Sequence, residues 1–550
     1  MEQPRFIIAV VLSFGVFLIW NYFFVDKNQV KKVEEKTEVQ QTVKTEAPVA
    51  VMASKAPERK IYQESSAQQN YIPRVIKIKT PYYSVNINEK GAAITSFVLS
   101  KYKETTNSDS PNKEIIPKEL EGGTVIAGFA GQSVPGLESA IFTSDIKAEL
   151  IDISEGEKEI LFYWKSENGI VIEKKYSFSS GTYMIGLVVN VINGSSEPIK
   201  DSLIVSLNSY YPDTTSAVGF EGPSALLNNS LEEVSLKDIE DKGVYTGTLK
   251  WISVQDRYFM SSLIPKIPVE TNMRLFLKDK GFLEAQYINP QKEIRPGAQE
   301  QVEFNLFFGP KSLKLLKSLG HDLNLAINFG WFDFLAKPFL YFMNFLYSFI
   351  PNYGVAIILL TVVTKIIFWP LGAKSYKSMN EMKKIQPLLA EIKGKYGNDK
   401  KRMNEEVMGL YKTYKINPMG GCLPMVAQMP VFFALYRMLY STIELRHAPF
   451  LFWIKDLSAP DRLFSFAFSI PFMEPPYGIP VLTIIMGATM FIQQKMTPAV
   501  GDPTQAKMMM ILPFVFTVIF VNFSAGLVLY WLINNVLSIL QQYIISRKAA

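Results

Sequence analysis

The sequence predicts a polytopic α-helical membrane protein with six transmembrane helices and a large extracytoplasmic antiparallel β-sandwich domain. Three observations support this fold class. Apolar residues make up 48% of the 550 residues and charged residues only 20%, with a mean hydropathy of +0.10. Several apolar runs are long enough to cross a hydrocarbon core of roughly 30 Å as helices. Between the first and second of these runs, the hydrophobic period becomes two, which is typical of strands.

The first apolar run covers residues 6–25 and is flanked by Arg5 on one side and Asp26 on the other. A cleavable signal peptide would have a shorter apolar core followed by small residues at a cleavage site. Here the run ends in Trp-Asn-Tyr-Phe-Phe at 20–24, and aromatic residues of this kind favour a membrane–water interface. We therefore expect residues 1–25 to form an uncleaved transmembrane anchor.

The other spans are predicted from apolar runs at 353–371, 421–441, 478–496 and 508–546. The last run has 39 residues and no charge. As one helix it would be about 58 Å long, nearly twice the hydrocarbon thickness. It must therefore hold two spans, and the sequence Asn-Phe-Ser-Ala-Gly at 522–526 predicts the turn between them.

The orientation follows from the bias of Lys and Arg among the short loops. Residues 374–415 carry eleven basic and five acidic side chains, whereas residues 442–478 carry three basic and four acidic ones. The first of these loops is therefore expected in the cytoplasm and the second outside it. Six spans then place both termini in the cytoplasm, including the tail 547–550, and residues 26–352 on the outer side.

The outer region divides into three parts by composition. Residues 26–70 are rich in Lys, Glu, Gln, Thr, Ala and Pro and cannot bury a core, which predicts a disordered tether. Residues 71–320 alternate apolar and polar positions between turn signals such as Asn193-Gly194, which predicts the β-sandwich. Residues 321–352 are rich in aromatic side chains but interrupted by charge and proline, which predicts an amphipathic helix lying along the membrane surface.

The composition also restricts the chemistry. Cys422 is the only cysteine, and His321 and His447 are far apart in sequence, so a disulfide framework and a local metal motif are excluded. The β-region contains no Gly-rich phosphate loop, paired-histidine motif or nucleophile elbow. We expect no catalytic residues, no cofactor and no metal site. The β-domain is equally compatible with docking a substrate or partner and with a passive folded module.

The cytoplasmic loop 374–415 predicts two amphipathic helices joined by a turn at 394–399, with Pro387 kinking the first helix. We expect their apolar stripes to form the seam of an antiparallel hairpin. The basic faces suit lipid headgroups, ribosomal RNA or a nascent chain, and charge does not choose among these.

Lys365 lies within the apolar run 353–371, where a charge costs about 2.5–3.5 kcal/mol on insertion scales. Snorkelling towards the cytoplasmic surface would explain it without a function. Thr361 precedes it by one helical turn and faces the same way. Gln428 and Asn534 are polar residues of other spans, and Pro424 and Pro430 flank Gln428. Together these residues suit a hydrated cavity with one fixed positive charge, which would bind an anionic or polar ligand.

Motifs in the C-terminal part resemble those of YidC-type membrane protein insertases, densely from about residue 330 to residue 545. The anchor and β-region match only the layout of the long Gram-negative type. The motifs are Asn-Pro-Met-Gly-Gly-Cys-Leu-Pro at 417–424, Gln-Met-Pro at 428–430, Ala-Leu-Tyr at 434–436, Glu-Leu-Arg at 444–446, Ala-Pro-Phe at 448–450, Trp-Ile at 453–454, Asp-Leu-Ser at 456–458 and Ser-Ala-Gly-Leu-Val-Leu-Tyr-Trp at 524–531.

The resemblance implies a five-helix insertase core over residues 353–546, built around a hydrophilic groove open to cytoplasm and lipid. The family's intramembrane arginine corresponds to Lys365, which lacks the planar donor fork of arginine. Trp531 stands where tyrosine is common. The substrate-groove residues carried over from the family or placed there as polar neighbours are Lys365, Thr361, Gln428, Tyr530, Trp531 and Asn534.

The same resemblance implies a multi-pass protein of the cell inner membrane, with residues 26–352 in the periplasm, that inserts nascent membrane proteins without making or breaking bonds. Expected partners are nascent membrane proteins, the Sec translocon, membrane lipids and the ribosome, the last through hairpin 374–415 and the C-terminal tail.

Two other functions remain as alternatives. A solute transporter would show repeated halves and helices broken at matching positions, and the sequence has no internal repeat. A Ser–Lys hydrolase would need a serine near Lys365. None lies within one or two turns of it, but another span could supply one. Uptake of a small solute by proteoliposomes, or labelling by a serine-directed probe, would identify either activity.

Overall fold

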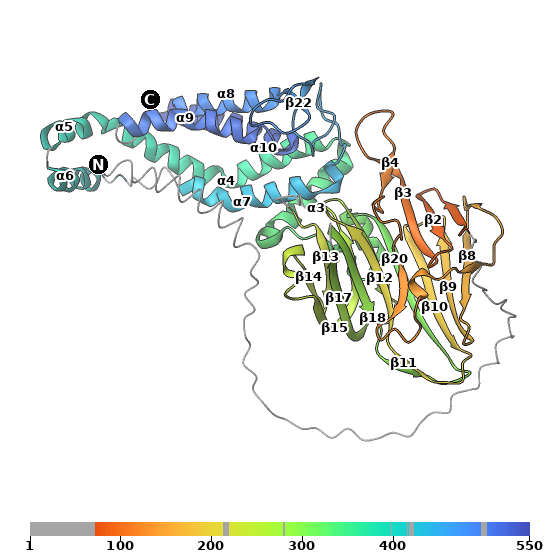
Figure 1. Ribbon diagram of the computed structural model, residues 1–550. Helices are drawn as coiled ribbons and strands as arrows, with labels where there is room; N and C mark the ends of the chain where they lie inside the picture. The colour runs from red at the N-terminus through yellow and green to blue at the C-terminus, as the bar shows by residue number, and fades with distance from the viewer. Residues whose placement is uncertain are drawn as a thin grey trace, which may run out of the picture.

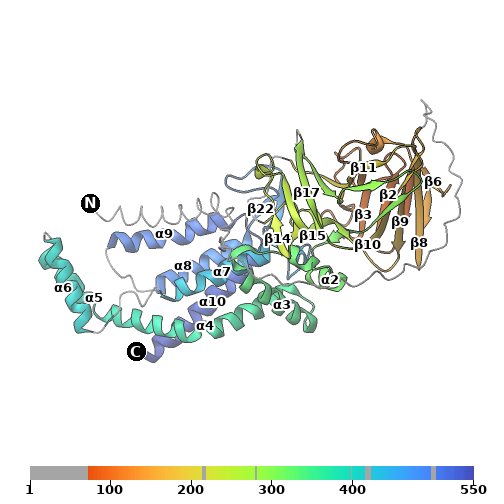
Figure 2. The same cartoon turned by 90° about the horizontal axis from the view of Figure 1, so that it is seen from below.

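The computed structural model describes residues 72–212, 219–278, 281–397, 399–414, 416, 423–496 and 503–549. Its two parts are a β-rich domain, drawn from orange to green, and a bundle of helices, drawn from green to blue (Figure 1). The bundle runs away from the β-domain, and α5 and α6 lie at its far end (Figures 1 and 2). The predicted anchor 1–25 and tether 26–70 lie outside the described residues.

The β-domain contains a five-stranded sheet and a 13-stranded sheet. The smaller has the order β4-β3-β2-β1-β7. Its strands are β1 (Val75–Lys79), β2 (Tyr83–Asn88), β3 (Ala93–Lys103), β4 (Asn112–Glu114) and β7 (Leu150–Asp152). The main path of the larger sheet is β5-β12-β18-β17-β15-β16-β20-β10-β9-β8-β6, and the β13–β14 hairpin pairs with β15. Its strands are β5 (Ile126–Phe129), β6 (Thr143–Ser144), β8 (Glu157–Lys165), β9 (Ile170–Ser179), β10 (Met184–Asn193), β12 (Leu203–Tyr210), β13 (Gly222–Leu227), β14 (Ser230–Glu233), β15 (Val244–Gln255), β16 (Phe259–Pro265), β17 (Val269–Lys278), β18 (Phe282–Ile288) and β20 (Gln299–Pro310). The other strands of the described residues form two small pairs: β11 (Ile199–Asp201) with β19 (Lys292–Ile294), and β21 (Leu463–Phe466) with β22 (Tyr477–Ile479), which lies outside the β-domain.

The two larger sheets pack face to face around an aromatic core. Phe97 of β3 stacks on Tyr83 of β2, with ring centroids 4.5 Å apart, and on Phe308 of β20, at 4.9 Å. Alternate residues of β2 and β10 are buried, as the period of two predicts. The prediction of an entirely antiparallel domain was wrong at one pair, because β1 and β7 are parallel. A parallel pair needs a long connection, and here the chain builds several other strands before it returns as β7.

Lys174 of β9 connects the sheets through a fully buried ammonium group. Its Nζ donates hydrogen bonds to the main-chain oxygens of Gly91, Ala92 and Val125, over 3.0, 2.8 and 2.7 Å. The three N–H donors of the group therefore have three acceptors. Burial lowers the pKa of Lys174 to about 7.

A helix lies within each apolar run predicted in the C-terminal part, and the run 508–546 contains two. The turn predicted at 522–526 is confirmed, since α9 ends at Phe520 and α10 begins at Ala525. In the described part of the chain, α4 and α10 are the two helices long and apolar enough to cross a membrane. The helices are α2 (Leu313–Leu319), α3 (Asp333–Phe349), α4 (Tyr353–Lys384), α5 (Gln386–Tyr396), α6 (Lys400–Thr413), α7 (Leu423–Ser441), α8 (Val481–Met496), α9 (Pro503–Phe520) and α10 (Ala525–Ala549).

The helical hairpin predicted at 374–415 differs from its prediction at one point. We expected a first helix kinked at Pro387, but α4 continues without interruption from Tyr353 to Lys384, and the helix breaks at Ile385. Pro387 occupies the first turn of α5, where its missing N–H costs no helical hydrogen bond. The predicted seam is confirmed, and it consists of Met382, Ile385, Leu389 and Ile416 packed with Val407, Leu410 and Tyr411.

Small residues bring the helices of the bundle close together. A side chain at Gly487 of α8 would meet Thr517 of α9, and one at Gly372 of α4 would meet Gln541 of α10. Close approach at glycine is typical of helix packing in membranes, where van der Waals contact and polar bonds hold helices together. α10 thus lies against both α4 and α8.

Candidate functional site

Lys365 of α4 forms a hydrogen bond with Ser538 of α10. Its Nζ donates to Ser538 Oγ over 2.6 Å, and that hydroxyl donates to the main-chain oxygen of Asn534 over 2.7 Å. Lys365 is 8% exposed and Ser538 is buried. Lys365 is the only charged residue among residues 353–371. The arrangement therefore holds the charge of this span in the seam between two helices.

The direction of the Lys365 side chain follows from its neighbours along the seam. Ile357 lies next to Gly526 near the start of both helices, and Gln541 Nε2 donates to Trp369 O over 2.9 Å further along. α4 and α10 therefore run in the same direction. Judged from these contacts, Ser538 lies about one turn further along α10 than the level of the Lys365 backbone. The lysine side chain thus extends towards the end of α4 that leads to the hairpin.

The polar side chains of α10 repeat at helical spacing. Asn534, Ser538 and Gln541 are separated by four and three residues, which places them on one face of the helix. Sequence reasoning identified Asn534 but missed Ser538 and Gln541, although this spacing was visible. Asn535 belongs to a neighbouring face, and its Nδ2 donates to Thr489 Oγ1 of α8 over 3.3 Å.

Thr361 and Thr364 use their hydroxyl groups within α4. Thr361 is fully buried and its Oγ1 donates to Ile357 O over 2.6 Å, while Thr364 Oγ1 donates to Thr361 O over 2.9 Å. These bonds satisfy hydroxyl groups inside an apolar span without a partner helix. Thr361 thus lies one turn from Lys365 and supports the packing of the seam.

The other three expected groove residues lie on either side of this seam. Tyr530 is buried in α10, two turns before Ser538. Trp531 packs edge-on against Phe432 of α7 at 4.8 Å and lies 5.1 Å from Phe520 of α9. Gln428 is half-buried, one turn before Phe432 on α7. The structure therefore brings Lys365 and Asn534 together through Ser538, and brings Trp531 to the α7 helix that carries Gln428.

Ser538 is the serine from another span that a Ser–Lys hydrolase would require. In such a pair the lysine accepts the proton of the serine so that the oxygen can attack. Here Lys365 Nζ lies 2.6 Å from Ser538 Oγ, and Ser538 Oγ lies 2.7 Å from the main-chain oxygen of Asn534. With the lysine charged, these contacts position a cation.

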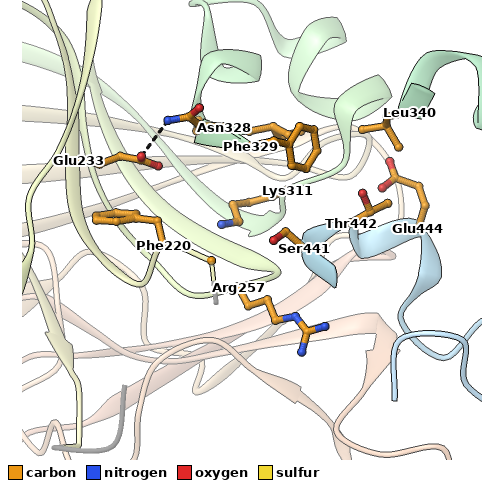
Figure 3. Close-up of a pocket in the computed structure, with 13 residues that line it drawn as sticks. Phe220, Glu233, Arg257, Lys311, Asn328, Phe329, Leu340, Ser441, Thr442 and Glu444 are labelled. Carbon is orange, nitrogen blue, oxygen red and sulfur yellow. Dashed lines mark hydrogen bonds between the residues drawn. The ribbon is translucent and has the colours of Figure 1, made fainter. Parts of the chain in front are cut away.

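A second polar site lies where the β-domain meets the helices. It encloses a cavity of about 20 Å³, enough for about one water molecule (Figure 3). Arg257 Nε donates to Tyr440 O of α7 over 2.7 Å, and the Nη2 of the same guanidinium also donates to this oxygen. Ser312 Oγ donates to Glu444 Oε1 over 3.2 Å. Beyond the cavity, Arg446 Nη2 donates to Lys103 O over 2.6 Å.

Burial changes the protonation of two groups at this junction. It raises the pKa of Glu444, whose Oε2 is buried without a hydrogen-bond partner among the described residues. It lowers the pKa of Lys311, whose Nζ donates to Gln255 Oε1 over 3.3 Å. Both shifts favour the neutral form, as expected for ionisable groups removed from water.

Comparison with known proteins identifies the family. Residues 345–550 match the family described as 60Kd inner membrane protein, and residues 75–342 match the YidC periplasmic domain. A protein of Syntrophobacter fumaroxidans named "Membrane protein insertase YidC" is 38% identical over all of both chains. The chain belongs to the YidC family of membrane protein insertases. A second YidC insertase, from Pelobacter propionicus, is 39% identical over 99% of each chain.

Membership of the YidC family establishes membrane protein insertion as the function. It also confirms the resemblance predicted from the sequence motifs. YidC proteins are insertases and not a family of enzymes that catalyse a reaction, which leaves the hydrolase and transporter alternatives without support. A solved structure described as "Active YidC insertase crystal structure with the first transmembrane domain resolved" is 19% identical, with a TM-score of 0.37, and covers 86% of this chain and 95% of its own.

Proposed function

We propose that the seam between α4 and α10 is the place where this insertase receives the polar part of its substrate. The observation that carries the proposal is the bond from Lys365 to Ser538 inside two long apolar helices. A lysine ammonium has three N–H donors, and Ser538 accepts one of them. An acidic or polar segment of a nascent protein would bind the others and thereby enter the membrane beside a fixed positive charge.

The route for the substrate's apolar segment follows the aromatic side of the bundle. Phe432 of α7, Trp531 of α10 and Phe520 of α9 form a continuous aromatic contact. We expect the apolar segment to slide along this surface into lipid while its polar tail is held near Lys365. Thr361, Gln428, Tyr530 and Asn534 complete the proposed groove, and hydration there would lower the barrier to desolvation of the tail.

In the proposed topology the protein crosses the membrane six times, with both termini in the cytoplasm and residues 26–352 in the periplasm. The boundaries are those predicted: an anchor (1–25), a tether (26–70), a β-domain (71–320), a surface helix (321–352), a core (353–546) and a tail (547–550). The basic hairpin 374–415 supports a role in receiving ribosomes or nascent chains at the cytoplasmic surface. The Sec translocon and membrane lipids are the other proposed partners.

The test replaces Lys365 in cells depleted of their own insertase. We expect Lys365→Glu to abolish insertion of single-span substrates that have short acidic tails, because the substituted side chain repels the tail. Lys365→Arg, the matched control, keeps the charge and should retain insertion. Normal insertion by the Lys365→Glu protein would overturn the role of the charge.

Site-specific crosslinking provides an independent test of the route. A photoreactive residue at position 428 or 531 should crosslink to a stalled nascent chain, whereas one at Ile267, on a turn of the β-domain, should not. Equal crosslinking at all three positions would contradict a defined groove.

A further inference from the structure

The loop between α7 and α8 carries an exposed aromatic patch. Residues 463–473 read Leu-Phe-Ser-Phe-Ala-Phe-Ser-Ile-Pro-Phe-Met and contain no charged side chain. Phe464, Phe468 and Phe472 are 68%, 64% and 83% exposed. Single exposed apolar residues are ordinary on protein surfaces, but a contiguous group of this kind marks an interaction site.

The backbone holds these rings outward. Phe464 and Phe472 have φ angles of 62° and 63°, in the left-handed region that bulky residues rarely adopt. Phe464 belongs to β21, which pairs with β22, and Phe466 stacks on Phe468 with centroids 5.2 Å apart. Conformations of this kind persist where the surrounding structure fixes them, and they gather at functional sites.

The patch is fastened to the end of the helix bundle. Arg462, immediately before it, donates through Nη1 to Val521 O over 2.7 Å, in the turn between α9 and α10. Asn522 of the same turn donates through Nδ2 to Phe472 O over 3.0 Å. Figure 1 shows β22 beside the corresponding ends of α8 and α10. The patch therefore keeps a fixed position relative to the membrane helices.

The apolar surface continues from the patch onto α8 and α9. β22 leads from the patch to the start of α8 at Val481, and hydrogen bonds from Arg462 and Asn522 tie the patch to the turn that follows α9. Among the described side chains of these helices, the large exposed apolar ones are Ile484, Ile485, Ile492, Met509, Ile511, Leu512, Phe514, Val515, Val518 and Ile519. In a membrane protein such faces contact lipid, and in the proposed topology the phenylalanine patch would lie at the outer end of this surface.

We propose that residues 463–473 form a membrane-surface anchor whose phenylalanine side chains insert into the outer leaflet. The proposal rests on the proposed topology, in which α8 and α9 span the membrane. The chemistry suits lipid, because residues 463–473 are rich in phenylalanine and carry no charge, and aromatic side chains favour the membrane–water interface. Such an anchor would fix the level at which the outer ends of α8 and α9 meet the headgroups.

The experiment measures the depth of single labelled cysteines in the full-length protein. The protein carries Cys422→Ser and either Phe472→Cys or Ser469→Cys, is labelled with a nitrobenzoxadiazole dye and is reconstituted in phosphatidylcholine–phosphatidylglycerol vesicles. Ser469→Cys retains every phenylalanine, so it reports on the intact patch. Ile267→Cys is the control, because this side chain is 76% exposed on the turn between β16 and β17.

We expect lipids labelled with doxyl near the headgroup to quench the dye at positions 469 and 472. Quenching by aqueous iodide should be about threefold or more weaker there than at position 267, since insertion removes the dye from water. Iodide quenching equal to that at position 267 would overturn the proposal. Protection from both iodide and doxyl lipid would also overturn it, because protein would then cover the patch.

A third labelled position separates this proposal from the topology on which it rests. Val518→Cys lies on the exposed face of α9. Doxyl quenching at position 518 without quenching at 469 and 472 would reject the anchor alone. An absence of doxyl quenching at all three positions would reject the proposed span of α9 as well.

Discussion

Lys365 and Ser538 are joined by a 2.6 Å hydrogen bond between two helices that run in the same direction. The Ser538 hydroxyl is also hydrogen-bonded to the main-chain oxygen of Asn534, so the backbone of α10 defines the position of the cation. A lysine is a flexible side chain with a compact charge, and it lacks the planar fork by which an arginine fixes its own geometry. Ser538 supplies the positioning that the lysine cannot supply itself.

Ser538→Ala should therefore impair insertion without removing the charge. The substitution deletes an acceptor worth about 1.5–3 kcal/mol to a charged donor, so the ammonium shifts along the seam. We expect slower insertion of substrates with acidic tails and little change for substrates with uncharged tails. Ser538→Thr retains the hydroxyl and should behave like the unchanged protein. Equal loss for both substrate classes would indicate general damage to the bundle.

Arg257→Ala should loosen the contact between the β-domain and α7. The guanidinium donates twice to Tyr440 O and stacks on the Tyr440 ring, with its central carbon 3.3 Å from the ring centroid. Its loss should cost about 1.5–3 kcal/mol of docking free energy. Hydrogen exchange should then rise in residues 311–319 and 440–445 and stay unchanged in β9 and β10. Arg257→Lys keeps the charge without the fork and should give an intermediate result.

The junction should also weaken as the pH rises. Burial raises the pKa of Glu444 above its ordinary value, so the folded form binds the proton more tightly than the unfolded chain. The corresponding stabilisation is complete below the ordinary pKa of about 4.3 and is lost as the pH rises through the folded value. The protection factors of amides in residues 311–319, which are corrected for the intrinsic pH dependence of exchange, should fall over this range, and Glu444→Gln should remove this fall. A pH response that survives this substitution would assign the effect to another group.

Lys174→Met should destabilise the β-domain. The substitution removes the ammonium that binds the main-chain oxygens of Gly91, Ala92 and Val125. Each buried oxygen left without a hydrogen bond should lower the free energy of unfolding by about 1–3 kcal/mol. Urea unfolding followed by near-ultraviolet circular dichroism would measure the loss. An unchanged midpoint would show that the neighbouring carbonyls find other donors.

The same lysine gives a second pH dependence, opposite in sign. Its pKa is about 7 in the folded protein and near 10.4 in an unfolded chain. Between these values the unfolded chain binds more protons, so the free energy of unfolding of the β-domain should rise with pH. Lys174→Met should show a flatter profile from pH 7 to about 10, measured by urea unfolding at fixed ionic strength. A rising profile in the variant would exclude Lys174 as its cause.

The sequence predicted the elements better than their contacts. Alternation identified β2 and β10, and an apolar run too long for one helix located the turn before Ala525. Both patterns are local and depend on burial of one face. The bond from Lys365 to Ser538 joins residues far apart in the chain. A local sequence pattern identifies the polar face of one helix, but it does not predict which face of another helix packs against it. Without the packing of α10, Ser538 is one of several small polar residues in an apolar helix.

Two local errors have similar causes. Pro387 was expected to bend a helix, but the preceding residues end α4 and leave the proline in a first turn, which it tolerates. The parallel pairing of β1 with β7 depends on where the chain returns after β6, which alternation does not record. In both cases the residue type was compatible with two arrangements, and tertiary packing selected one.

The arginines at the junction donate hydrogen bonds to main-chain oxygens. Arg257 binds the carbonyl of residue 440, and Arg446 binds the carbonyls of residues 103 and 104. Every amino acid supplies such an oxygen, so the side chains at 103 and 104 can drift during evolution without breaking the contact. The contact therefore depends on the two arginines and on the path of the backbone. A β-domain grafted onto this helical core would need the same loop shape at 103–104, Arg257, and Ser312 for its bond to Glu444.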